Sequence, residues 1–371
     1  MRFLTIALAV LFGFSGSAQQ SLPAGTGTLV ESKIPAAPLK GNVLGDPAEA
    51  RVAVYLPPSY ASSPERRYPT VYLLHGYTAD IEIFTRFLFA KVGFVKAMDE
   101  AIKRGASREM IVVVPSGRNR YFGSFYVNSA VTGAWEDLFA RDLVAWVDKT
   151  YRTIASAESR GIAGHSMGGY GALMLAMKHP DVFSAVYALS PCCVALEADL
   201  GPDNPAWNKA LEIQSPDQLK SEPASFEDFY STAFVALAAA LSPNPSKAPL
   251  YVDLPFKKQG RYLVPNEDAY AKWRAQLPLY LVESHRNNLE KLKAIHLEYG
   301  ALEEFAHIRS ATQALSTELA ARGIGHTFEV YEGGDHMNMI ANRIETRVLR
   351  FFSDVLSPEN GPSRSSVQEE R

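Results

Sequence analysis

One serine lies inside a glycine-rich pentapeptide, Gly-His-Ser-Met-Gly at residues 164–168, between a strand-like run and an apolar helical run. A G-x-S-x-G pattern in this context is typical of a nucleophile elbow, a sharp turn that exposes the serine hydroxyl. Glycines at 164 and 168 leave out side chains that would clash in such a turn. We therefore expect Ser166 to be a nucleophile at the start of a helix over 167–178, whose N-terminus favours negative charge.

Short runs of Val, Ile, Leu and Tyr alternate with longer amphipathic stretches along most of the chain. This alternation predicts a mainly parallel sheet with helices on both faces, the α/β class. Strands are expected at residues 51–56, 70–75, 110–114, 159–163, 185–189, 294–299 and 326–331. Helices are expected at residues 94–104, 135–150, 167–178, 304–322 and 339–355, where apolar positions recur every three or four residues.

The alternation breaks between about residues 197 and 288, where Pro, Ser and Asn recur around an apolar helical piece at 232–241. In a sheet of this kind, the loops at the carboxyl ends of the strands surround the ligand crevice. This insertion follows the strand next to the elbow. We therefore expect it to form a helical cap over Ser166 that sets the choice of substrate.

Both ends of the chain differ in composition from the middle. Residues 1–18 combine a charged start, an apolar stretch and small residues, the pattern of a secretory signal peptide. The apolar stretch is too short to span a bilayer and no cysteine follows it to accept lipid, so no membrane anchor is expected. We expect an exported protein, periplasmic or secreted, with one domain over 19–356 and a disordered tail at 357–371.

The formal net charge of −3 gives no sign of a nucleic-acid or anionic-membrane partner, so a small-molecule substrate fits better. The only two cysteines, Cys192 and Cys193, are adjacent. Because neighbouring residues in a strand point to opposite sides, we expect two buried thiols rather than a bridge. No cofactor and no metal is expected, and the sequence gives no indication of oligomeric state.

Serine acyl transfer needs a base and a carboxylate to orient it. His336 lies in a Gly-Gly-Asp-His loop between the last expected strand and the last expected helix, which makes it the candidate base. The acid is expected between the serine and the histidine in chain order. Glu303, just after the strand at 294–299, is the first choice; Glu304 is the near alternative, and other acids such as Asp335 stay open.

The tetrahedral oxyanion also needs hydrogen-bond donors. The backbone N–H of Met167 comes with the elbow, and Tyr77, in the His-Gly-Tyr loop after the strand at 70–75, is the expected second donor. Three aromatic residues, Phe122, Phe125 and Tyr126, are candidates for lining the acyl pocket.

Four motifs, at residues 72–76, 135–137, 164–169 and 334–336, carry a family resemblance. With them the chain resembles the α/β-hydrolase family that includes esterase D, feruloyl esterases, enterochelin-type esterases and mycolyltransferases, from about residue 51 to 355 apart from the insertion. The resemblance implies an α/β-hydrolase fold, with Ser166 as nucleophile, His336 as base, and Tyr77 and Met167 as oxyanion donors. Many members carry Asp where this chain has Glu303.

The function expected from these features is a secreted serine carboxylesterase that works through an acyl-enzyme intermediate. An acyltransferase to a sugar or alcohol would use the same residues. A non-catalytic binding protein on a hydrolase fold is the alternative from a different class.

Overall fold

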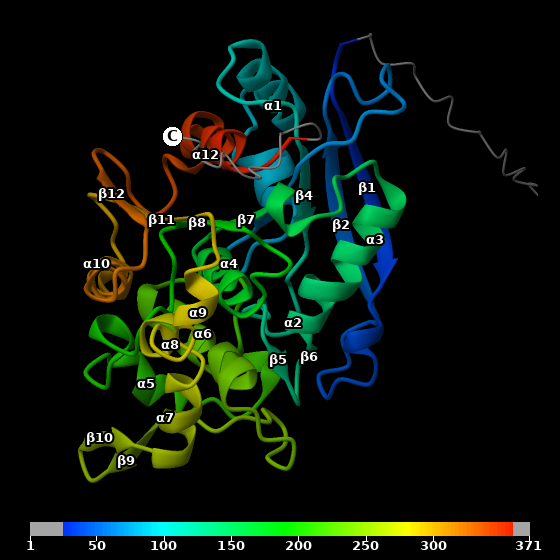
Figure 1. The fold of residues 1–371 in the computed structure, drawn as a ribbon. Coiled ribbons are helices and arrows are strands. Elements are labelled where there is room, and N and C mark those ends of the chain that lie inside the picture. The colour runs from blue at the N-terminus through cyan, green and yellow to red at the C-terminus, as the bar shows by residue number, and fades with distance from the viewer. Residues whose placement is uncertain (1–24, 359–371) are drawn as a thin grey trace, which may run out of the picture.

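The computed structural model describes residues 25–358, and an eight-stranded sheet lies at its centre (Figure 1). The strand order is β1-β2-β4-β3-β7-β8-β11-β12. Antiparallel pairs join β1 to β2 and β2 to β4, and every other neighbouring pair is parallel. The strands are β1 (Thr28–Pro35), β2 (Glu49–Leu56), β3 (Thr70–Leu74), β4 (Ile111–Pro115), β7 (Arg160–His165), β8 (Ala185–Leu189), β11 (Ala294–Gly300) and β12 (Thr327–Tyr331). The predicted signal peptide and the tail from residue 359 onward lie outside the described residues.

Two layers of helices cover the two faces of the sheet, and the side-chain alternation of the strands divides the core between them. On β2, Val52 and Val54 belong to one buried cluster, whereas Ala53 and Tyr55 belong to the other. This period of two is what a strand buried on both faces requires. The first cluster includes residues of α3 (Leu143–Thr150), α4 (Met167–Lys178) and α10 (Ala306–Ala321), and the second includes residues of α1 (Phe94–Lys103) and α12 (Leu349–Val355).

The predicted helices exist, but two of them are not regular. The helix expected at 135–150 consists of α2 (Trp135–Asp137), a π-helical turn at Leu138–Asp142 and α3. The helix expected at 339–355 consists of α11 (Ile340–Arg343), a π-helical turn at Ile344–Val348 and α12. Each π-helical turn shifts the buried stripe, which a constant period of 3.6 residues does not anticipate.

All seven predicted strands are present, and the structure adds β1, which the sequence did not indicate. β1 is an edge strand whose residues are mostly half-buried or exposed, so it lacks the continuous apolar run of the inner strands. Two short hairpins were also not predicted. They are β5 (Asn128–Ser129) with β6 (Gly133–Ala134), and β9 (Phe256–Gln259) with β10 (Tyr262–Pro265).

The segment between β8 and β11 forms a helical layer below the carboxyl ends of the strands in the view of Figure 1. Its longest helix, α6 (Phe226–Leu241), contains the apolar piece expected at 232–241 and is almost wholly buried. Trp207 stacks on Phe234 at 3.6 Å between ring centroids, which joins α5 to α6. The other helices of this segment are α5 (Ala206–Ala210), α7 (Glu267–Arg274), α8 (Pro278–Leu281) and α9 (Arg286–Leu289). Among residues 25–358, no helix combines the length and apolar character needed to cross a bilayer.

Candidate active site

Ser166 occupies the turn between β7 and α4 in a backbone conformation that non-glycine residues rarely adopt, with φ of 57° and ψ of −117°. A Cβ atom on Gly164 would collide with the backbone of Gly168, and one on Gly168 would collide with the carbonyl of Leu74. Only glycine fits these two positions, so β3, β7 and α4 approach closely enough to make the turn sharp. The structure thus shows the strand–turn–helix geometry that the pentapeptide predicts.

His336, in the loop between β12 and α11, contacts the carboxylate that was the first choice for the acid. The Nδ1 atom of His336 lies 2.9 Å from Oε2 of Glu303. Glu303 is 1% exposed, and its other oxygen accepts a hydrogen bond from the backbone N–H of Phe305 at 3.2 Å. An imidazole that donates through Nδ1 keeps Nε2 available as an acceptor. Ser166 and His336 line the same cavity, so the three residues expected to form a triad lie at one place.

The three carboxylates near His336 contact different groups. Glu304 accepts a hydrogen bond from the backbone N–H of His336 at 2.9 Å, and so holds the loop rather than the ring. Asp335 accepts from the backbone N–H groups of Met337 and Asn338, at 2.8 and 2.7 Å, and so closes the turn. Among these three acids, Glu303 alone contacts the imidazole.

His165 also holds the His336 loop, a role that the sequence did not indicate. Its Nε2 atom donates a hydrogen bond to the carbonyl oxygen of His336 at 2.8 Å, and the two ring centroids are 4.5 Å apart. Burial, and then the neighbouring His336, hold the pKa of His165 well below its ordinary value. His165 is therefore a neutral donor. Its place directly before Ser166 was visible in the sequence, but nothing there indicated which loop it would reach.

The loop after β3 is braced by buried side chains. The Nε2 atom of His75 accepts a hydrogen bond from the backbone N–H of Gly117 at 2.8 Å, so Nδ1 carries the proton and donates to the carbonyl of Gly76 at 2.9 Å. Burial lowers the pKa of His75, which favours this neutral form. The hydroxyl of Tyr126 donates to the carbonyl of His75 at 2.8 Å. Three hydrogen bonds thus fix the backbone of this loop.

The braced loop lies against the elbow, where the two expected oxyanion donors are found. A Cβ atom on Gly76 would be 3.3 Å from the Cβ of Ser166. Within residues 25–358, the backbone N–H groups of Tyr77 and Met167 have no hydrogen-bond acceptor. Two unused donors beside a nucleophile are what a developing oxyanion requires.

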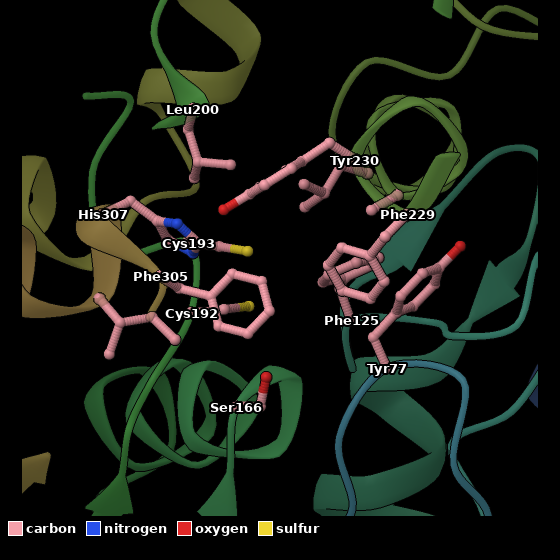
Figure 2. Close-up of a pocket in the computed structure, with 13 residues that line it drawn as sticks. Tyr77, Phe125, Ser166, Cys192, Cys193, Leu200, Phe229, Tyr230, Phe305 and His307 are labelled. Carbon is pink, nitrogen blue, oxygen red and sulfur yellow. The ribbon is translucent and has the colours of Figure 1, made fainter. Parts of the chain in front are cut away.

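Ser166 lies at the junction of two cavities that differ in size and character. The smaller one, about 30 Å³, is almost entirely apolar, and α6 supplies Phe229, Tyr230, Ala233 and Leu237 to its wall (Figure 2). The larger one, about 560 Å³, contains His336. Its other lining residues are Gly76, Tyr77, Thr78, Ala79, Asp80, Glu82, Ile83, Phe87, His165, Phe229, Phe305 and Met337.

The aromatic residues proposed for the acyl pocket have different positions. Phe125 lines the smaller cavity and stacks on Tyr77, with ring centroids 5.7 Å apart. Tyr126 is fully buried and braces the loop after β3 instead. Phe122 lies under the guanidinium of Arg118, 5.3 Å from the ring centroid, and lines neither cavity.

One group among the described residues has the spacing of metal ligands: His296, Glu298 and Glu329. The guanidinium of Arg343 already binds both carboxylates, and the Tyr187 hydroxyl donates to Glu298 at 2.5 Å. The two carboxylates share one guanidinium, so the cluster has the character of a salt-bridge network within the fold.

The sheet order, the turn at Ser166 and the position of His336 after β12 together define an α/β-hydrolase. A family model described as "Putative esterase" matches residues 47–345, which is most of the chain. The protein belongs to this esterase family, and the family resemblance predicted from the four motifs is confirmed.

Known proteins with similar sequences and folds agree with this assignment. Two proteins of Mycobacterium tuberculosis, Esterase Rv1288 and Esterase MT1326, are each 34% identical to this chain over 135 residues. The aligned residues cover 36% of this chain and 27% of each relative. The aligned stretch is thus about a quarter of those proteins. A ferulic acid esterase structure superposes with a TM-score of 0.59 at 20% identity, covering 89% of this chain and 99% of that one. An S-formylglutathione hydrolase structure from Agrobacterium tumefaciens superposes with a TM-score of 0.54 at 17% identity, covering 91% of this chain and 98% of that one. At these identities the two structures show the shared fold.

Proposed function

We propose that the protein is an exported serine carboxylesterase in which Ser166, His336 and Glu303 form the catalytic triad. The observation that carries this proposal is the 2.9 Å contact between Glu303 and His336 in the cavity that Ser166 lines. A buried carboxylate on Nδ1 fixes the tautomer of the imidazole and stabilises the imidazolium that forms during acyl transfer. A non-catalytic binding protein has no need of this arrangement.

The reaction follows from the positions of these groups. Nε2 of His336 takes the proton of the Ser166 hydroxyl as the oxygen attacks the ester carbonyl, and the backbone N–H groups of Tyr77 and Met167 bind the resulting oxyanion. The imidazolium then returns the proton to the leaving alcohol. Water attacks the acyl-enzyme by the same route and releases the acid.

The two cavities correspond to the two halves of an ester. Because His336 must reach the leaving oxygen, the alcohol lies in the larger cavity, which contains this residue. The smaller, apolar cavity contains Ser166 but lacks His336, so it takes the acyl group. Its walls come partly from α6, which supports the prediction that the insertion forms a cap and sets acyl specificity.

Hydrolysis of p-nitrophenyl esters tests the activity, and labelling with a fluorophosphonate tests the nucleophile. Wild-type protein should hydrolyse the ester and take one label, and Ser166→Ala should do neither. Ser62→Ala, which changes an exposed loop serine, is the matched control and should keep both. Labelling of Ser166→Ala at the wild-type rate would contradict the assignment.

Two further points need separate measurements. Adding a competing alcohol and analysing the products distinguishes a hydrolase from an acyltransferase, because a transferase forms the new ester in preference to the free acid. Export is supported by the sequence of residues 1–18. N-terminal sequencing of the protein from a periplasmic or culture fraction should find a mature chain that starts near Gln19.

A further inference from the structure

Two neighbouring thiols share the acyl-side cavity. Cys192 and Cys193 follow β8, both are free and buried, and both line the smaller cavity with Ser166. Figure 2 shows both sulfur atoms directed into this space. The prediction of two buried thiols without a bridge is confirmed, but the two side chains do not point to opposite sides, because the chain has left strand geometry here. Positive φ angles of 40° at Ser190 and 56° at Cys193 take the chain out of the strand conformation.

The backbone keeps these thiols together and holds them against the nucleophile. Adjacent Cα atoms are about 3.8 Å apart across a trans peptide, so two side chains that enter the same cavity bring their sulfur atoms close together. The backbone N–H of Cys192 donates to the carbonyl oxygen of Ser166 at 3.1 Å. The pair is therefore a fixed part of the elbow's surroundings.

The surroundings favour a reagent that binds neutral thiols. Burial, and then the adjacent Cys192 thiol, hold the pKa of the Cys193 thiol well above its ordinary value. Metal ions and alkylating agents need thiolates, which this apolar cavity disfavours. Trivalent arsenic is thiophilic and pyramidal, and it binds thiols with loss of water, so it can close a ring between adjacent cysteines.

We propose that Cys192 and Cys193 form a vicinal dithiol site for trivalent arsenicals of the type R–As=O. The two S–H bonds and the As=O bond break, two As–S bonds form, and one water molecule carries away the oxygen and both protons. Arsenic stays in the +3 state and the thiols are not oxidised, so no oxidant or reductant is required. The product is uncharged, which suits a cavity lined by Leu200, Phe229 and Leu237.

Binding at this site has a consequence for turnover. A group attached to both sulfur atoms fills a cavity of only about 30 Å³ beside Ser166. The acyl group of an ester then has no room, so the arsenical inhibits the reaction. The binding site stands on the geometry of the two cysteines, whereas this inhibition also rests on the proposed function.

Phenylarsine oxide tests both statements on the full-length protein, and arsenite serves as a smaller probe. Intact mass spectrometry should find one arsenical per chain. Ester hydrolysis should fall as the adduct forms and recover with 2,3-dimercaptopropanol but not with an equal concentration of thiol groups as 2-mercaptoethanol. Because the second As–S bond forms within the same molecule, Cys192→Ser and Cys193→Ser should each raise the half-inhibitory concentration by about 10²-fold.

Each variant is compared with its own untreated rate, because both cysteines line the acyl pocket. Absence of the adduct from wild-type protein with both probes would overturn the dithiol site, even if the protein has no esterase activity. An adduct that survives in both serine variants would overturn it as well. A complete adduct with unchanged hydrolysis would keep the site but contradict its overlap with the acyl pocket. A protein that forms the adduct but hydrolyses no ester when untreated would count against the proposed function alone.

Discussion

Replacing Glu303 and Glu304 one at a time by glutamine distinguishes the carboxylate that binds the imidazole of His336 from the carboxylate that binds its backbone N–H. In Glu303→Gln, the amide NH₂ can donate to Nδ1 of His336, which moves the ring proton to Nε2 and leaves no acceptor for the serine proton. The equivalent change in a serine protease lowers kcat by about 10⁴. We expect a loss of this order for Glu303→Gln, with little change in KM.

The effect of Glu304→Gln should be much smaller. The glutamine oxygen still accepts from the backbone N–H of His336, so only the charge assistance of one exposed hydrogen bond is lost. That assistance is worth about 1 kcal/mol, or roughly fivefold in rate. The two variants should therefore differ by about 10³ in kcat on a p-nitrophenyl ester.

Thermal unfolding serves as the control, because both variants should melt as cooperatively as the wild type. A larger loss in Glu304→Gln than in Glu303→Gln would refute the reasoning and assign the acid to the next residue. Small and equal losses would show that neither carboxylate orients the base.

Three further predictions follow from the same geometry. Ser166→Ala should lower kcat by about 10⁴ to 10⁶ while remaining folded by circular dichroism, and more than a tenth of wild-type turnover would exclude Ser166 as nucleophile. Ala233→Phe adds a ring to the acyl-side cavity, so kcat/KM for butyrate relative to acetate esters should fall at least about tenfold. Phe87→Ala, in the other cavity, should leave that acyl ranking unchanged. Burial lowers the pKa of both His75 and His165 from 6.5, so the unfolded chain takes up their protons first as the pH falls. In urea unfolding, the contribution of these two histidines to the free energy of unfolding should be constant above pH 6.5. Below that pH it should fall by up to about 1.4 kcal/mol per pH unit for each histidine. His165→Gln, which keeps a donor, should show the smaller slope.

The inner strands and the sharp turn at Ser166 were predictable because each depends on a local pattern. β4 and β8 are short apolar runs whose side chains are more stable when buried than in water. The turn at Ser166 needs glycines at fixed positions. β1 was not predictable in this way, because an edge strand buries few side chains and so leaves little apolar pattern.

The acid and the thiols show the limits of the sequence within the site. Glu303 and Glu304 are adjacent and chemically identical, and they differ only in whether the carboxylate reaches the ring or the backbone of a loop about thirty residues away. Cys192 and Cys193 share a cavity because Ser190 and Cys193 itself have positive φ, which no residue type there indicates. Both facts depend on backbone direction after a strand ends, where side-chain periodicity no longer applies.

Ser166 holds a backbone conformation that its own β-carbon disfavours, which costs the folded state on the order of 1 to 3 kcal/mol. Glycine adopts the same angles without this cost and loses about 0.5 to 1 kcal/mol through the greater freedom of the unfolded chain. Alanine at this position keeps the β-carbon and hence the strain. A library selected for thermal stability alone should therefore enrich glycine at position 166 and discard the hydroxyl, so directed evolution of this protein needs a selection for turnover from the first round.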